Sequence, residues 1–179
     1  MDSFYKEIPG KAGAGSFFVI ISFNSMEVFF KIKELAEEAF SKVHLESGVL
    51  PRWLPEPSEK FVGGIGEVTR ILSFRRRINR EELPELKKKC IRIRNRFILN
   101  DRSIRIVPGY VTGHNAVIAS LFDDFHRVYL FHGVYAEVVY KFERLELQAI
   151  STAPEFFFMK EVKYYFSNLR EYHLRTEEI

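Results

Sequence analysis

The spacing of apolar and polar residues predicts that strands and helices alternate along the first half of the chain. An unbroken apolar run at residues 16–23 predicts a strand that is buried on both faces. Apolar residues at helical spacing predict helices over residues 24–43 and 79–98. Between these helices, period-two alternation over residues 68–78 predicts a strand, and it puts Arg76 on the apolar face of that strand.

The second half of the chain reads mainly as short strands followed by one helix. An alternating segment at residues 100–111 predicts a strand that ends in a Pro-Gly turn at Pro108 and Gly109. Residues 115–122 are compatible with either a strand or a helix. The remaining predicted elements are a two-stranded hairpin, an edge strand and a closing aromatic helix, at residues 126–140, 142–150 and 151–175.

This order of elements predicts a single α+β domain over residues 1–179, with a mainly antiparallel sheet and helices packed on one face. With a weak short strand near Val49, the first six elements are strand, helix, strand, strand, helix and strand. This order matches a split β-α-β pattern, which is typical of ferredoxin-like proteins, and a C-terminal hairpin and helix extend it. Residues 1–15 are polar and glycine-rich and are expected to be flexible. Residues 46–66 are expected to form an irregular loop, in which Trp53 either anchors a lid or plugs the core.

The composition supports a globular protein and argues against several functional classes. Apolar residues make up 46% of 179 residues, which excludes wholesale disorder, and the net charge of +3 is small for a dedicated nucleic-acid binder. The single cysteine, Cys90, excludes an intramolecular disulfide and lies in an apolar helical stripe. No apolar run is long enough to span a bilayer, so a cytoplasmic protein is expected. The abundance of charged residues beside a single glutamine resembles thermophile proteins.

The hairpin contains the most informative polar residue of the chain. His132 and Gly133 resemble the two-residue turns that need positive φ at both positions. A two-residue turn places Val128 opposite Glu137 and puts His126 diagonally across from it, so that Glu137 points inward from an apolar face. A buried carboxylate needs a partner, or its pKa rises.

Three interpretations of Glu137 remain open at this point. In the first, Glu137 is a buried acid that is hydrogen-bonded by an arginine or a tyrosine hydroxyl. In the second, Glu137, His126 and Arg76 together surround a polar pocket. In the third interpretation the register differs and Glu137 faces water.

The basic region of residues 75–96 is either a solvated helix face or a surface for RNA phosphates. Neither glycine-rich segment forms a phosphate loop, and no histidine pair has metal-ligand spacing, so no cofactor or metal is predicted.

The C-terminal half contains four characteristic segments, which are "PGYV", an Ala-Ser step at residues 119–120, "HRVYL" and "GVYAEV". In these segments it resembles the prokaryotic domain of unknown function 4416 family, whose members are uncharacterised and are sometimes labelled as GTP-binding. The chain departs from the family pattern at Val107, where an acidic residue is usual, and near Asn115, where a lysine is common. The residues and the resemblance together give the candidate binding site as Arg76, Tyr110, His126, Arg127, Tyr135 and Glu137.

The favoured function is a ligand-binding or interaction module, and whether the protein is an enzyme stays open. One alternative is an enzyme that acts on a small anionic substrate, with Glu137 or His126 as the acid-base group. The other is an RNA-binding protein that uses the basic region of residues 75–96. A small anionic ligand and a second copy of the chain stay open as partners, nucleic acid is less favoured, and no membrane association is predicted.

Overall fold

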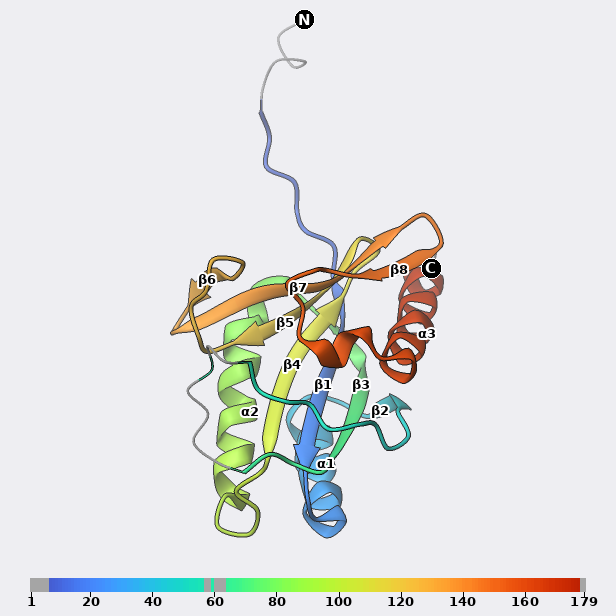
Figure 1. Cartoon of the computed structure of the whole chain (residues 1–179). Helices are drawn as coiled ribbons and strands as arrows, with labels where there is room; N and C mark the ends of the chain where they lie inside the picture. Colours follow the sequence, from blue (N-terminus) through green and yellow to red (C-terminus); the bar gives the residue numbers. More distant parts are fainter. Residues whose placement is uncertain (1–6, 57–58, 60–63, 178–179) are drawn as a thin grey trace, which may run out of the picture.

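Eight strands and three α-helices make up the computed structural model, which describes residues 7–56, 59 and 64–177 (Figure 1). In chain order the elements are β1 (Gly15–Phe23), α1 (Met26–Ala39), β2 (Val43–Glu46), β3 (Val68–Ile78), η2 (Arg80–Glu82), α2 (Leu83–Phe97), β4 (Arg105–Val111), β5 (Asn115–Ser120), β6 (Val128–Phe131), β7 (Val134–Glu143), β8 (Glu146–Ala149), η3 (Glu155–Phe158) and α3 (Lys160–Glu177).

The strands form one sheet in the order β2-β3-β1-β4-β5-β7-β6, and β8 pairs with β7. Every strand pairing among the described residues is antiparallel, as the sequence predicted. Strand β1 lies inside the sheet between β3 and β4, and all nine of its residues are buried. The unbroken apolar run therefore did indicate a central strand that is covered on both faces.

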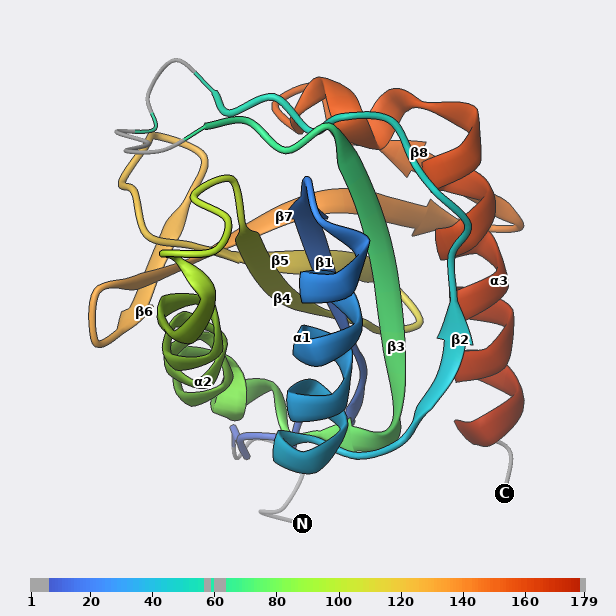
Figure 2. The ribbon, with the colours of Figure 1, turned by 90° about the horizontal axis from the view of Figure 1, so that it is seen from below.

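Alternate side chains of β1 enter two separate cores. Phe17, Val19 and Ile21 pack with α1 and α2, whereas Phe18 and Ile20 pack with η3 and α3. Figure 2 shows α1 and α2 on one side of the strands and α3 on the other. The prediction that the helices share one face is right for α1 and α2 and wrong for α3. A sheet with apolar residues on both faces needs a cover on each, and the last helix provides the second one.

Strand β3 contains an irregularity that changes the position of Arg76. The register with β1 steps from Ser16 opposite Arg77 to Phe18 opposite Ser73, so β3 has two more residues than β1 in this interval. Extra residues interrupt the period-two alternation. Arg76 consequently leaves the apolar face: its side chain is 45% exposed and pairs with Glu82 at 2.6 Å. The prediction that Arg76 points inward is wrong.

The Pro-Gly pair lies inside β4 instead of forming the predicted turn. Pro108 is opposite Val19 of β1, and Gly109 is opposite Phe18. A β-carbon at Gly109 would come within 2.3 Å of the Val117 carbonyl oxygen and 2.4 Å of Phe18 Cζ. Glycine is required here because β5 and an aromatic ring approach the backbone closely, and not because the chain turns.

The sheet opens between β4 and β5. Pairing of these two strands covers only Gly109–Val111 of β4, although β4 pairs with β1 along its whole length. Pro108 has no N–H group to donate, so a proline is compatible with the point where the pairing with β5 ends. Beyond it β5 and β7 cross the direction of β1 and β4, as Figure 1 shows. Residues 105–107 of β4 therefore line a space and are not covered by β5.

The hairpin of β6 and β7 has the predicted turn but a different register. His132 and Gly133 have φ values of 53° and 76°, which confirms the turn. Val128 lies opposite Ala136, however, because the pairing contains an irregularity between Tyr129 and Phe131.

Among the described residues of the predicted loop at 46–66, only Glu46, the last residue of β2, and a single bridge from Leu50 to Thr69 are part of the sheet.

Substituting Gly109 by Ala is expected to lower the free energy of unfolding by about 1–3 kcal/mol, because the backbone of β5 or the ring of Phe18 has to move. Chemical denaturation followed by circular dichroism measures this loss. Gly48→Ala is the matched control, since nothing lies within 4 Å of a β-carbon at that exposed position. Equal effects of the two substitutions would contradict the close approach at Gly109.

Candidate functional site

Glu137 lies on β7 opposite Ile118 of β5, and it is buried. Its Oε1 atom accepts hydrogen bonds from His126 Nε2 at 2.7 Å and from Arg127 Nε at 2.9 Å. Its Oε2 atom has no hydrogen-bond partner among the described residues. Burial raises the pKa of Glu137, and the charge of Arg127 together with the hydrogen bond from His126 opposes that rise. The acid therefore points inward, and the interpretation in which it faces water is wrong.

Arg127 connects three separate parts of the chain. Its guanidinium bonds Glu137 of β7, forms an ion pair with Glu56 of the long loop that joins β2 to β3, and donates to the Phe122 carbonyl after β5 at 3.4 Å. Burial disfavours its charge, but the attraction of Glu137 and Glu56 is larger and raises the pKa of Arg127. Two carboxylates around one guanidinium make a compensated, buried charge cluster.

Three of the six predicted site residues lie together, and three lie elsewhere. His126, Arg127 and Glu137 are joined by hydrogen bonds. Arg76 is on the surface with Glu82, Tyr110 packs beside α2 with Arg80 over its ring, and Tyr135 contacts the ring of Tyr129. The partner of Glu137 is thus Arg127, the neighbour of His126 in the sequence, and not Arg76.

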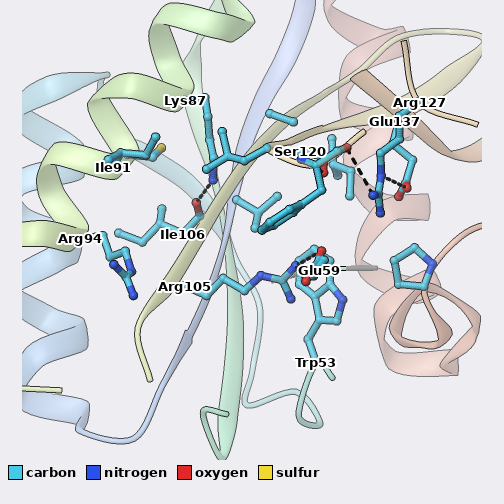
Figure 3. Close-up of a pocket in the computed structure, with 17 residues that line it drawn as sticks. Trp53, Glu59, Lys87, Ile91, Arg94, Arg105, Ile106, Ser120, Arg127 and Glu137 are labelled. Carbon is cyan, nitrogen blue, oxygen red and sulfur yellow. Dashed lines mark hydrogen bonds and ion pairs between the residues drawn. The ribbon is translucent and has the colours of Figure 1, made fainter. Parts of the chain in front are cut away.

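A cavity of about 280 Å³ lies where the sheet opens, between α2, β4, the end of β5 and the long loop (Figure 3). This volume is near the lower end of the roughly 300–1,000 Å³ that is usual for small-molecule pockets. Its walls combine apolar and charged side chains. The charged residues of the wall are Glu59, Lys87, Arg94, Arg105, Arg127 and Glu137.

Two of these cations belong to α2 and were not predicted as site residues. Lys87 Nζ donates to the Ile106 carbonyl at 3.0 Å, and Arg94 Nε donates to the Ile104 carbonyl at 2.9 Å. Neither forms an ion pair with a carboxylate of the residues that the structure describes. The sequence did hold a signal for them, because Lys87 and Arg94 are seven residues apart on the edge of the stripe that contains Cys90.

Lys87 is an uncompensated buried charge. Its side chain is buried, and burial lowers the pKa of its ammonium group from 10.5 to about 8. A charge that leaves water without a counter-ion is costly. Buried charges of this kind occur more often at functional sites than elsewhere, although some are only structural.

The opposite wall of the cavity is a compensated pair beneath an aromatic ring. Arg105 donates to both carboxylate oxygens of Glu59, at 2.6 and 2.7 Å, and its guanidinium lies 4.3 Å from the centre of the Trp53 ring. Trp53 is buried and stacks on Phe156 with ring centroids 5.2 Å apart. Trp53 thus covers the core and also borders the cavity.

The described residues contain one cluster whose donor atoms could hold a metal ion. One ligand atom each from Glu56, His126 and Glu137 lies within 4.8 Å of the others. Arg127 already pairs with both carboxylates, so a cation bound there would compete with its guanidinium. The cluster is therefore better suited to fixing the cavity wall than to binding a metal.

The fold and the cavity together define an α+β protein with a charged pocket at the opening of its sheet. A family model described as Domain of unknown function (DUF4416) matches residues 14–173, and the chain belongs to this family. This confirms the resemblance that the sequence suggested. No curated protein and no solved structure matches the chain. No helix among the described residues is long and apolar enough to cross a membrane.

Replacing Arg127 by Met is expected to lower the free energy of unfolding by about 3–5 kcal/mol at pH 8, because Glu137 and Glu56 lose their counter-ion inside the protein. Without Arg127 the folded-state pKa of Glu137 lies further above its unfolded value. The folded state then binds more protons than the unfolded state, so the variant recovers stability as the pH falls from 8 toward 5.

Denaturant titrations at several pH values measure this effect. Arg76→Met is the control, because it breaks an exposed pair with Glu82 and is expected to cost less than about 1 kcal/mol. A loss at Arg127 no larger than the loss at Arg76 would show that the cluster does not stabilise the fold.

Replacing Lys87 by Met, unlike replacing Arg127, is expected to raise the free energy of unfolding, by about 1–3 kcal/mol at pH 7. At pH 7 both states carry the charge, so the full cost of burying it is present. Between pH 8 and 10.5 the folded wild type binds fewer protons than the unfolded chain, so wild-type stability rises and the advantage of the variant shrinks.

The midpoints of thermal unfolding of both proteins, measured from pH 7 to pH 10, test this prediction. Lys89→Met on the same helix serves as the control, since Lys89 is only partly buried. A destabilised Lys87→Met variant would mean that the ammonium group is compensated in solution.

Proposed function

We propose that the protein binds a small anionic ligand in the cavity between α2, β4 and the long loop. The observation that carries this proposal is the charge of the wall. Glu59 is paired with Arg105, and Glu137 is paired with Arg127. Glu56 is a second carboxylate on Arg127, and Lys87 and Arg94 form no ion pair with a described carboxylate, so the positive charge around the cavity is still in excess. An anion that entered the cavity would supply the missing counter-charge.

A second feature supports a ligand that also donates a hydrogen bond. Oε2 of Glu137 is buried without a partner among the described residues, and Glu137 lines the same cavity. A buried acceptor without a donor costs roughly 1–3 kcal/mol, so a ligand hydroxyl that reached it would add to the binding energy. Small hydroxy acids combine both properties.

The two alternatives have less support. His126 contacts Glu137 but does not line the cavity. A substrate in the cavity would therefore reach Glu137 but not His126, which disfavours acid-base catalysis by the two residues. The basic region of residues 75–96 does not form one surface. Arg77 bonds the His173 carbonyl of α3, Lys87 and Arg94 face the cavity, and Lys88 pairs with Glu85. RNA binding through a continuous basic face is therefore disfavoured.

We also infer that β1 to β4 with α1 and α2 form a ferredoxin-like core. The order β2-β3-β1-β4, the antiparallel pairing and the two helices on one face all support this inference. In this frame β5, β7 and β6 are additions at the β4 edge. The cavity then lies at the junction between the core and its extension.

Thermal unfolding in the presence of lactate, succinate or inorganic phosphate, at constant ionic strength, tests the proposal. At least one anion is expected to raise the wild-type midpoint, and glycerol at the same concentration is not. Isothermal titration of the best anion should show binding weakened about tenfold or more in Arg94→Gln, because a charge-assisted hydrogen bond is lost.

Arg92→Gln is the matched control, since Arg92 is exposed on the same helix. Equal weakening in Arg92→Gln and Arg94→Gln would place the anion on the surface of α2. No shift with any anion would contradict the proposed function.

A further inference from the structure

The amino group of Lys87 lies at the wall of the cavity in apolar surroundings. The side chain projects from the first half of α2 toward β4, where its Nζ donates to the Ile106 carbonyl (Figure 3). Lys87 is only 7% exposed, and it lines the cavity together with Cys90, Ile91 and Val107. This combination of burial, access to a cavity and missing counter-ion is the environment that activates lysine as a nucleophile.

We propose that Lys87 reacts with the carbonyl group of a small α-keto acid in the cavity and forms an imine with it. This inference rests on the proposed anion site and specifies its ligand class. Lys87 would contact the carbonyl carbon, while the carboxylate of the keto acid would be held by the positive charge of Arg94.

The state of the amine favours this reaction at neutral pH. Only a neutral amine has the lone pair that attacks a carbonyl carbon. Because burial lowers the pKa of Lys87 from 10.5 to about 8, its neutral fraction at pH 7 is about 300-fold larger than that of an exposed lysine. Of the charged groups that face it, Arg94 and Arg105 favour the neutral form and Glu59 opposes it.

The reaction balances without any further reagent. The lone pair of Nζ forms a bond to the carbonyl carbon, and a proton moves from nitrogen to oxygen to give a carbinolamine. The hydroxyl group then leaves as water after it takes one proton, and the nitrogen electrons form the carbon–nitrogen double bond. Solvent supplies that proton.

Cys90, the other nucleophilic side chain of the wall, is unsuited to the same task. Burial raises the pKa of its thiol to about 12, so the reactive thiolate is scarce at neutral pH. The two neighbouring groups respond to burial in opposite ways, because burial favours the neutral form of each. The neutral form is the reactive state of an amine and the unreactive state of a thiol.

Reductive trapping tests the proposal. The full chain is incubated with pyruvate and sodium borohydride at pH 7.5, and the product is analysed by intact mass and peptide mapping. Borohydride reduces the imine to a stable secondary amine. One adduct is expected, on the peptide that contains Lys87. It is expected to be absent from Lys87→Met and retained in Lys89→Met. The labelling rate should reach half its maximum near pH 8, whereas exposed lysines should require a pH near 10.5.

Lactate separates this proposal from the anion site, because it has a carboxylate but no carbonyl group that forms an imine. Stabilisation by lactate and pyruvate without an adduct at Lys87 would overturn the imine and leave the anion site standing. An adduct at Lys87 without stabilisation by any anion would support the reactive amine and refute the anion site. Labelling spread equally over Lys87 and exposed lysines would also overturn the proposal.

Discussion

The buried contact between Arg127 and Glu137 is the interaction on which the part of the molecule around the cavity depends. Arg127 reaches Glu56 in the long loop, the carbonyl of Phe122 after β5, and Glu137 in β7. Strands β5 and β7 pair as far as Ser120 and Tyr135, whereas the described residues of the long loop pair with neither strand, yet all three segments border the cavity. A single guanidinium with five donors can satisfy partners in several directions, which an ammonium group does less well. The wall of the cavity is therefore fixed by charge as well as by apolar packing.

The wall of the cavity contains two kinds of charged side chain. Arg127 and Arg105 each have carboxylate partners, so their positions are fixed and their charges are balanced. Lys87 donates to the backbone carbonyl of Ile106 in β4 instead, and Arg94 donates to the carbonyl of Ile104 just before that strand. Carbonyl dipoles orient a cation but carry no net charge, so these two side chains keep an unbalanced field at the cavity. The first pair supports the architecture, and the second is the basis of the proposal that the cavity binds an anion.

Local sequence patterns predicted much of the fold, and the failures have physical causes. The antiparallel sheet, the central strand and the positive φ values at His132 and Gly133 all followed from local patterns. Arg76 was misplaced because alternation fails where a strand carries extra residues, and sequence alone does not reveal which strand bulges. Gly109 was misread as a turn because a glycine needed for close approach looks the same in a sequence. Lys87 was missed because the cavity exists only where β4 and β5 diverge, which is a tertiary feature.

The position of Trp53 gives the molecule an internal optical reporter. It is the only tryptophan of the chain, it borders the cavity, and the Arg105 guanidinium lies against its ring. Indole emission depends on nearby charge and on contact with water, and a charged ligand in the cavity would change both around Trp53. The intrinsic fluorescence of the unmodified protein should therefore follow occupancy of the cavity directly, without a label and without interference from a second indole.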